Sequence, residues 1–156
     1  MPDAANEHIA GYEYLAASRD RGHSLYAVAT ETLMRLNDDD QDCILVPQVL
    51  YEFWVVATRP IDVNGLELSV DDAKLAIEKW MTAYRILLDE PGIYQLWESL
   101  VMTHQVKGKP AHDARLVAAM QQHQVTKLLT FNVKDFDRFP EISVYSPQEI
   151  LTGKLN

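Results

Sequence analysis

The segment that decides the fold spans residues 112–136 and reads HDARLVAAMQQHQVTKLLTFNVKDF. Its first half has the apolar spacing of an amphipathic helix, with Asp113 at the head of the apolar face. The run LLTF at 128–131 then predicts a strand, and a polar turn with Asn132 and Asp135 follows it. In open α/β sheets, ligands bind beyond the carboxyl ends of the strands. The segment therefore predicts an α/β fold with Asp113 and Asp135 at one edge of the sheet.

Both carboxylates also have a purely structural interpretation. The positive end of a helix dipole favours an Asp in the first turn, where Asp113 is predicted. Asp135 would equally serve to cap the turn before Phe136. The pair indicates a functional site more strongly than either residue alone, because perturbed charged groups cluster at such sites.

The other elements are predicted from hydrophobic periodicity. We expect helices over residues 3–19, 22–36, 49–59, 69–87 and 91–104, a short helix from Pro147, and strands over 43–46 and 142–145. Ser69 and Asp72 resemble a capping box that opens the helix over 69–87. His104 continues an apolar stripe, which favours a packed side chain over a ligand.

Glu52 lies inside the apolar helix predicted over residues 49–59. An ionised carboxylate among valines carries a large desolvation cost unless a cation or hydrogen-bond donors meet it. Glu52 is therefore a candidate functional residue. The alternative is that its side chain reaches solvent or pairs with Arg59.

Composition limits the possible functions. A chain of 156 residues with 47% hydrophobic residues suits one domain, residues 1–156. No run approaches the ~18 apolar residues of a membrane span, and the first residues lack the features of a signal peptide. We therefore expect a cytoplasmic protein with no membrane partner. The single Cys43 has no partner for an internal disulfide.

The formal net charge of -9 argues against nucleic-acid binding through a broad basic surface. Converging carboxylates can instead hold divalent cations, which bridge to phosphates. Lys107 and Lys109 form a basic turn directly before Asp113. This turn would suit a phosphate backbone, although exposed lysines equally serve solubility.

Three segments together resemble the PIN domain, particularly the toxin ribonucleases of VapBC toxin-antitoxin pairs. They are PQVLYEFW with Glu52, HDA with Asp113, and TFNVKDF with Asn132 and Asp135. The similarity covers roughly residues 15–150. It implies a three-layer α/β/α domain with a mainly parallel sheet.

The resemblance also implies a metal-dependent endoribonuclease. In such domains, clustered carboxylates hold Mg²⁺ or Mn²⁺, which activate water for cleavage of RNA. Glu52, Asp113 and Asp135 would be the catalytic metal ligands. Asn132 would lie near the metal or the substrate, and Lys107, Lys109 or Arg115 would meet phosphates. The expected partners are the RNA substrate, a cognate antitoxin protein and a second copy of the chain in a homodimer.

The amino end departs from this pattern. The first strand of the family is an apolar run that ends in Asp-x-Asn, and counting places Gly11 at its Asp and Glu13 at its Asn. No such run precedes Gly11, so we expect the central strand to be missing and residues 1–20 to be atypical. Glu13 then replaces the missing metal ligand, or the site lacks one and is weakened, or the true start of the chain is altered.

Two other functions remain open. The chain could be a catalytically inactive PIN-like domain that binds an antitoxin or RNA. His112 and Asp113 also match the two-residue signature of HD-type metal phosphohydrolases. Those enzymes look all-helical, so the strands predicted over 128–131 and 142–145 argue against this alternative.

Overall fold

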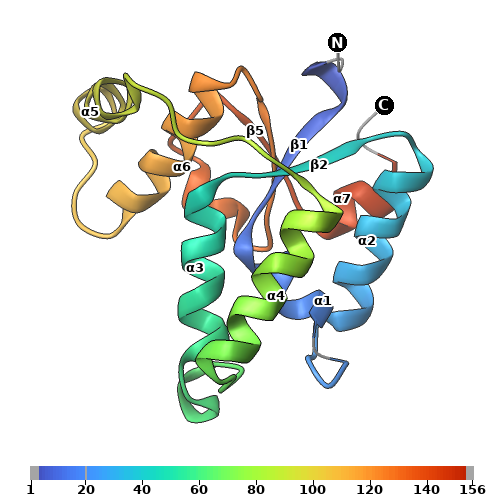
Figure 1. Ribbon diagram of the computed structural model, residues 1–156. Coiled ribbons are helices and arrows are strands. Elements are labelled where there is room, and N and C mark those ends of the chain that lie inside the picture. The colour runs from blue at the N-terminus through green and yellow to red at the C-terminus, as the bar shows by residue number, and fades with distance from the viewer. Residues whose placement is uncertain (1–3, 20, 154–156) are drawn as a thin grey trace.

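The chain folds around one five-stranded sheet in a computed structural model, which describes residues 4–19 and 21–153 (Figure 1). The strand order is β3-β2-β1-β4-β5, and every pairing is parallel. The strands are β1 (Glu7–Ala10), β2 (Asp42–Leu45), β3 (Arg85–Ile86), β4 (Lys127–Leu129) and β5 (Ser143–Tyr145). The predicted α/β class with a mainly parallel sheet is confirmed.

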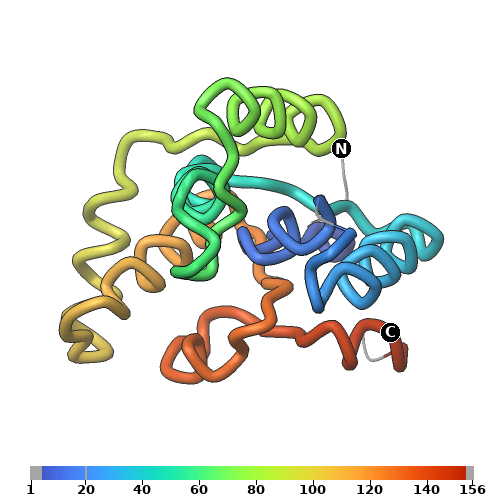
Figure 2. The backbone as a smooth tube through the Cα atoms, turned by 90° about the horizontal axis from the view of Figure 1, so that it is seen from below, coloured from blue at the N-terminus to red at the C-terminus, as the bar shows by residue number. Residues whose placement is uncertain are grey.

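The α-helices are α1 (Tyr12–Arg19), α2 (Tyr26–Asp38), α3 (Pro47–Thr58), α4 (Val70–Ala83), α5 (Ile93–Thr103), α6 (Pro110–Gln122) and α7 (Pro147–Leu151). Short 3₁₀ turns are η1 (Ala4–Asn6), η2 (Ile61–Val63) and η3 (Val133–Phe136). The helix α1 packs on α2 and α3, α3 on α4, and α2 on α7, whereas α5 packs on α6. Figure 1 shows α5 and α6 on one side of the molecule and α2 and α7 on the other. Seen from below, the yellow and orange course of α5 and α6 again lies apart from the blue of α1 and α2 (Figure 2).

The prediction that the first strand is missing is wrong. The strand β1 is the central strand, and its Ile9 is in register with Ile44 of β2 and Leu128 of β4. The helix predicted over 3–19 is accordingly confined to α1, from Tyr12 onward. Asp3, where that prediction began, lies outside the described residues.

Two polar residues explain why β1 does not have the sequence pattern of a buried strand. All four of its residues are buried, including Glu7 and His8. Glu7 forms an ion pair with Arg85 at the start of β3. The Nδ1 atom of His8 lies 3.2 Å from the carbonyl oxygen of Asn6, and burial lowers the pKa of His8 to about 4. A neutral imidazole and a paired carboxylate are thus accommodated in the middle of the sheet.

A second correction concerns the helix predicted over residues 69–87. Ser69 caps it as predicted, accepting a hydrogen bond from the Asp72 backbone N–H at 3.0 Å. The helix α4 nevertheless ends at Ala83, and the next residues form β3, in register with the end of β2. The sheet therefore gains an edge strand that helical periodicity had concealed.

The five-stranded sheet also argues against an HD-type metal phosphohydrolase, because those enzymes are all-helical. Within the part of the chain that the structure describes, no helix is long and apolar enough to cross a membrane.

Candidate active site

A cleft of about 650 Å³ opens beyond the carboxyl ends of the central strands. Three segments that follow strands form the wall of this cleft. Gly11 directly follows β1, α3 begins two residues after β2, and Thr130 directly follows β4. The strand β1 lies between β2 and β4, and the chain runs outward from it in opposite directions. Such a switch point is where open α/β sheets bind their ligands.

Four carboxylates line this cleft. Glu13 lies in the first turn of α1, Glu52 near the middle of α3, Asp113 in the first turn of α6, and Asp135 in η3. The three acids predicted from the sequence are therefore on one cleft, and Glu13 joins them. Their roles in metal binding and catalysis remain predictions.

Glu52 is connected to α6 by a glutamine. The Gln48 Nε2 atom donates to Glu52 Oε1 at 2.8 Å and to the His112 carbonyl oxygen at 2.7 Å. Burial raises the pKa of Glu52, and the hydrogen bond from Gln48 partly offsets that rise. The charges of Glu13 and Asp113 raise it further. Gln48 thus holds a partly buried carboxylate against the first turn of α6.

The carboxyl group of Asp113 also has a raised pKa. Burial, followed by the charge of Asp135, raises the pKa of Asp113 to about 6. His112 and Arg138 act in the opposite direction. Repulsion among the acids is therefore an intrinsic property of this cleft, and a cation would relieve it.

Asp135 and Asn132 are positioned by the turn after β4. The Asn132 backbone N–H donates to the Thr130 hydroxyl at 3.0 Å, and the Asp135 backbone N–H donates to the Asn132 carbonyl at 3.1 Å. Both side chains are exposed and line the cleft. They can therefore reach a ligand from solvent without breaking a buried contact.

The donor set suits a hard divalent cation, because all four acids offer carboxylate oxygens. Within residues 4–19 and 21–153, however, no three His, Cys, Asp or Glu side chains lie close enough together to share one ion. Binding would require side chains to turn toward one another. Repulsion among the acids, which adds to burial in raising the pKa values of Glu52 and Asp113, opposes such a movement until a cation is present.

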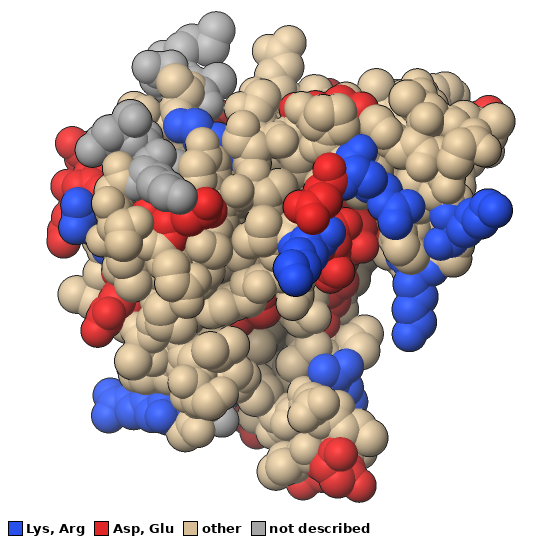
Figure 3. All heavy atoms as spheres, turned by 180° about the vertical axis from the view of Figure 1, so that it is seen from behind, with Lys and Arg blue, Asp and Glu red and all other residues tan. Residues whose placement is uncertain are grey.

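The basic residues predicted to contact phosphates are divided by the structure. Lys109 lines the cleft together with Arg59, for which the sequence suggests only a pairing with Glu52. Lys107 is exposed but is not part of the lining. The Arg115 guanidinium lies outside the lining and pairs with Asp89 at 2.7 Å. On the back face of the molecule, Figure 3 shows acidic atoms in and beside a hollow, with basic atoms close to them.

Several residues of the cleft were not singled out from the sequence. They are Tyr12, Gln48, Tyr51, Val55 and Thr130. The signal for Gln48 was its position one turn before Glu52, and the signal for Thr130 was its place at the end of a strand. Tyr51 and Val55 gave none, because exposed apolar residues on a helix are common.

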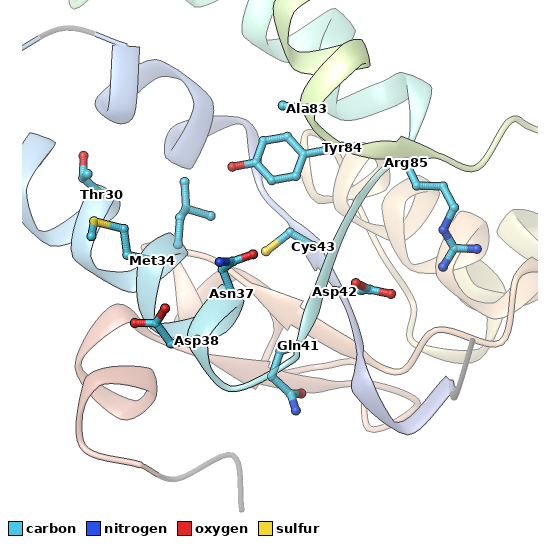
Figure 4. Close-up of a pocket in the computed structure, with 11 residues that line it drawn as sticks. Thr30, Met34, Asn37, Asp38, Gln41, Asp42, Cys43, Ala83, Tyr84 and Arg85 are labelled. Atoms are coloured by element: carbon cyan, nitrogen blue, oxygen red, sulfur yellow. The ribbon is translucent and has the colours of Figure 1, made fainter. Parts of the chain in front are cut away.

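A second hollow, of about 720 Å³, lies at the amino ends of β2 and β3, away from the cleft (Figure 4). The side chains of Asn37, Cys43 and Tyr84 point toward its centre. Burial raises the pKa of the Cys43 thiol to about 12, which leaves no reactive thiolate at neutral pH. Arg85 at its rim is paired with Glu7. This hollow lacks the converging acids of the cleft.

No family model and no characterised protein sequence matches the chain. Solved structures do. A chain of VapBC2 from Rickettsia felis, bound to promoter DNA, aligns with a TM-score of 0.62 and 12% identity over 90% of this chain and 98% of that one. VapC20 from Mycobacterium tuberculosis, a toxin that cleaves the sarcin-ricin loop, aligns with a TM-score of 0.56 and 19% identity. This alignment covers 78% of this chain and 86% of VapC20. A chain of a toxin-antitoxin complex from Klebsiella pneumoniae aligns with a TM-score of 0.60 and 17% identity, over 90% of this chain and 97% of that one.

These alignments span nearly the whole of the matched chains, and at such low identity they establish a common fold. The central position of β1 and the cleft at the strand ends are consistent with that fold. The chain therefore has the PIN-like α/β/α fold of VapC toxins.

Proposed function

We propose that this protein is a metal-dependent endoribonuclease and the toxin of a type II toxin-antitoxin pair. The observation that carries the proposal is the arrangement of Glu52, Asp113 and Asp135 around one cleft at the carboxyl ends of the strands. A Mg²⁺ or Mn²⁺ ion bound there would supply a nucleophilic water and neutralise charge at phosphorus. The three carboxylates would hold the ion directly or through water.

The remaining residues of the cleft would bind and orient the RNA. Arg59 and Lys109 offer positive charge to the phosphates flanking the scissile bond. Asn132, which is exposed beside Asp135, offers a neutral amide to the sugar or phosphate. Because the cleft itself is acidic, these cations and the bound metal are needed to hold a polyanion there.

Incubation of the purified protein with RNA tests the proposal. The substrates are a sarcin-ricin loop oligonucleotide, chosen because VapC20 cleaves that loop, and total cellular RNA. We expect cleavage with Mg²⁺ or Mn²⁺ and none in EDTA. A folded protein that cleaves neither RNA with either cation would instead support the catalytically inactive alternative, for which the Gly at position 11 is the supporting observation.

An antitoxin partner is part of the proposal. Tyr51 and Val55 line the acidic cleft yet are 66% and 56% exposed. A partner segment that carries apolar side chains and an Arg would cover both residues and pair with Glu52 or Asp113. The proposed assembly also includes a homodimer of this chain, which the family resemblance implies.

Co-expression with the product of the neighbouring gene tests this partnership. We expect the two proteins to purify together, and Val55→Lys to weaken the complex at least tenfold. Met102→Lys is the matched control, because Met102 is an exposed apolar residue of α5 outside the cleft, and this variant should leave the complex intact. Purification of the chain alone, or equal retention of the partner by both variants, would count against an antitoxin in the cleft.

A further inference from the structure

A side chain at Gly11 would require the carboxylate of Glu13 to move. A Cβ atom built on Gly11 would lie 2.7 Å from Glu13 Oε2, 2.8 Å from Oε1 and 2.9 Å from Cδ. Real Cβ atoms do not approach other heavy atoms so closely. The carboxylate of Glu13 therefore stands beside the end of β1, where the first atoms of a side chain at position 11 would otherwise be.

The Glu13 carboxylate is also held in this place. Its Oε1 atom accepts hydrogen bonds from the Thr130 hydroxyl and from the Phe131 backbone N–H, the latter at 3.0 Å. Both donors belong to the segment that follows β4. The oxygen nearest to Gly11 is the other one, Oε2. Two neighbouring strand ends thus fix one carboxylate between them.

The position faces the other acids of the cleft. Gly11 and Glu13 line it together with Glu52, Asp113 and Asp135. The charge of Glu13 acts on Glu52 and Asp113, and the charge of Asp135 acts on Glu13. Glu13 therefore interacts electrostatically with the other three acids, and a cation that drew these side chains together would relieve their repulsion.

We propose that Gly11 and Glu13 together replace one aspartate at the end of β1, with Glu13 Oε2 as a fourth carboxylate ligand for the divalent cation. This inference rests on the proposed metal site and adds the residue that completes it. The absence of a side chain at residue 11 is what allows the longer side chain, two residues later, to turn back into the cleft. Gly11 is then a requirement of the site, not a loss from it.

The structure also predicts the effect of restoring an Asp at position 11. The strand needed to aim that side chain is present, so a missing strand is no obstacle. The obstacle is Glu13 itself, whose carboxylate would be in contact with the new side chain. Gly11→Asp alone should therefore lower the melting temperature of the metal-free protein, because two carboxylates would compete for one place.

Calorimetric titration with Mn²⁺ tests the inference in wild type, Glu13→Gln, Gly11→Asp/Glu13→Ala and Glu31→Gln. Glu13→Gln keeps an oxygen that can accept from Thr130 and Phe131 but loses the charge, so the dissociation constant should rise about tenfold or more. The double variant should return to within about threefold of wild type, because it moves the carboxylate back to position 11. Glu31→Gln, on the exposed side of α2, removes one charge far from the cleft and should bind like wild type.

The outcomes separate this inference from the proposal beneath it. Wild-type affinity in Glu13→Gln would show that Glu13 only ties α1 to the turn after β4, which overturns the inference and leaves the proposed function standing. A folded double variant that does not regain affinity would overturn the exchange of one Asp for the Gly11 and Glu13 pair. Failure of the wild type itself to bind Mn²⁺ would overturn the metal site and this inference together.

Discussion

Replacing Asp113 by Asn is expected to lower the rate of RNA cleavage about 100-fold or more. Residues that merely support a metal ligand already change affinity or activity by about 10- to 100-fold, and Asp113 is proposed as a direct ligand. The first turn of α6 places its side chain in the cleft beside Asp135. Initial rates of cleavage at saturating Mg²⁺ provide the measurement, with Glu31→Gln as the charge-matched control.

The same substitution should stabilise the metal-free protein at neutral pH. The folded protein holds the pKa of Asp113 near 6, above its ordinary value of 3.8, so the folded state binds this proton more tightly than the unfolded state. Stability from this group therefore falls as the pH rises from about 4 to 6, and the penalty is complete above that range. After allowance for solvent screening of a half-exposed group, Asp113→Asn should gain about 1 to 2 kcal/mol at pH 7.5.

Urea unfolding in EDTA at pH 4 and pH 7.5 checks this sign. The gain should be present at pH 7.5 and nearly absent at pH 4, where the wild-type carboxyl is protonated. A variant that is less active and also less stable at pH 7.5 would indicate damage to the fold, and would contradict a cluster of repelling acids.

Phe53→Ala is expected to cost about 3 to 5 kcal/mol of unfolding free energy. The Phe53 side chain is fully buried on α3 and meets Trp80 of α4 edge to face, with ring centroids 6.4 Å apart. Its removal would leave a cavity between two helices, one of which carries Glu52. This loss is a large share of the total stability, which is about 5 to 15 kcal/mol for most domains.

Tyr51→Ala, two residues earlier on α3, is the control for this prediction. Its side chain is 66% exposed, so the change in stability should stay within about 0.5 kcal/mol. The difference between the two midpoints of urea unfolding gives the result. Equal midpoints for the two variants would mean that α3 does not pack in the way the structure describes.

The parts of the site carried by regular hydrophobic patterns could be predicted from the sequence. Helical spacing located the helices of Glu52 and Asp113, and the run before Asn132 located β4. Parallel strands then bring their carboxyl ends to one edge. Local periodicity was sufficient for these elements, because each helix buries a regular set of apolar side chains, such as Val49 and Phe53 on α3 and Leu116 and Val117 on α6.

The strand β1 could not be predicted in this way, because two of its four residues are polar. Glu7 is buried only because Arg85 pairs with it, and Arg85 lies 78 residues later in the chain. The strand β3 is two residues long and directly continues the apolar stripe of α4. In both cases a tertiary contact overrides the local pattern. A tertiary contact also explains why Arg115 is outside the cleft, because its guanidinium pairs with Asp89.

Calorimetric titration of wild type and Asp113→Asn with Mn²⁺ at pH 7.5 tests the central claim most directly, because it detects the cation without requiring the correct RNA. The account predicts saturable binding to the wild type and binding weakened at least tenfold in Asp113→Asn, while Glu31→Gln binds normally. Equal affinity of all three proteins for Mn²⁺, or no saturable binding to the wild type, would contradict a metal site formed by the acids of this cleft.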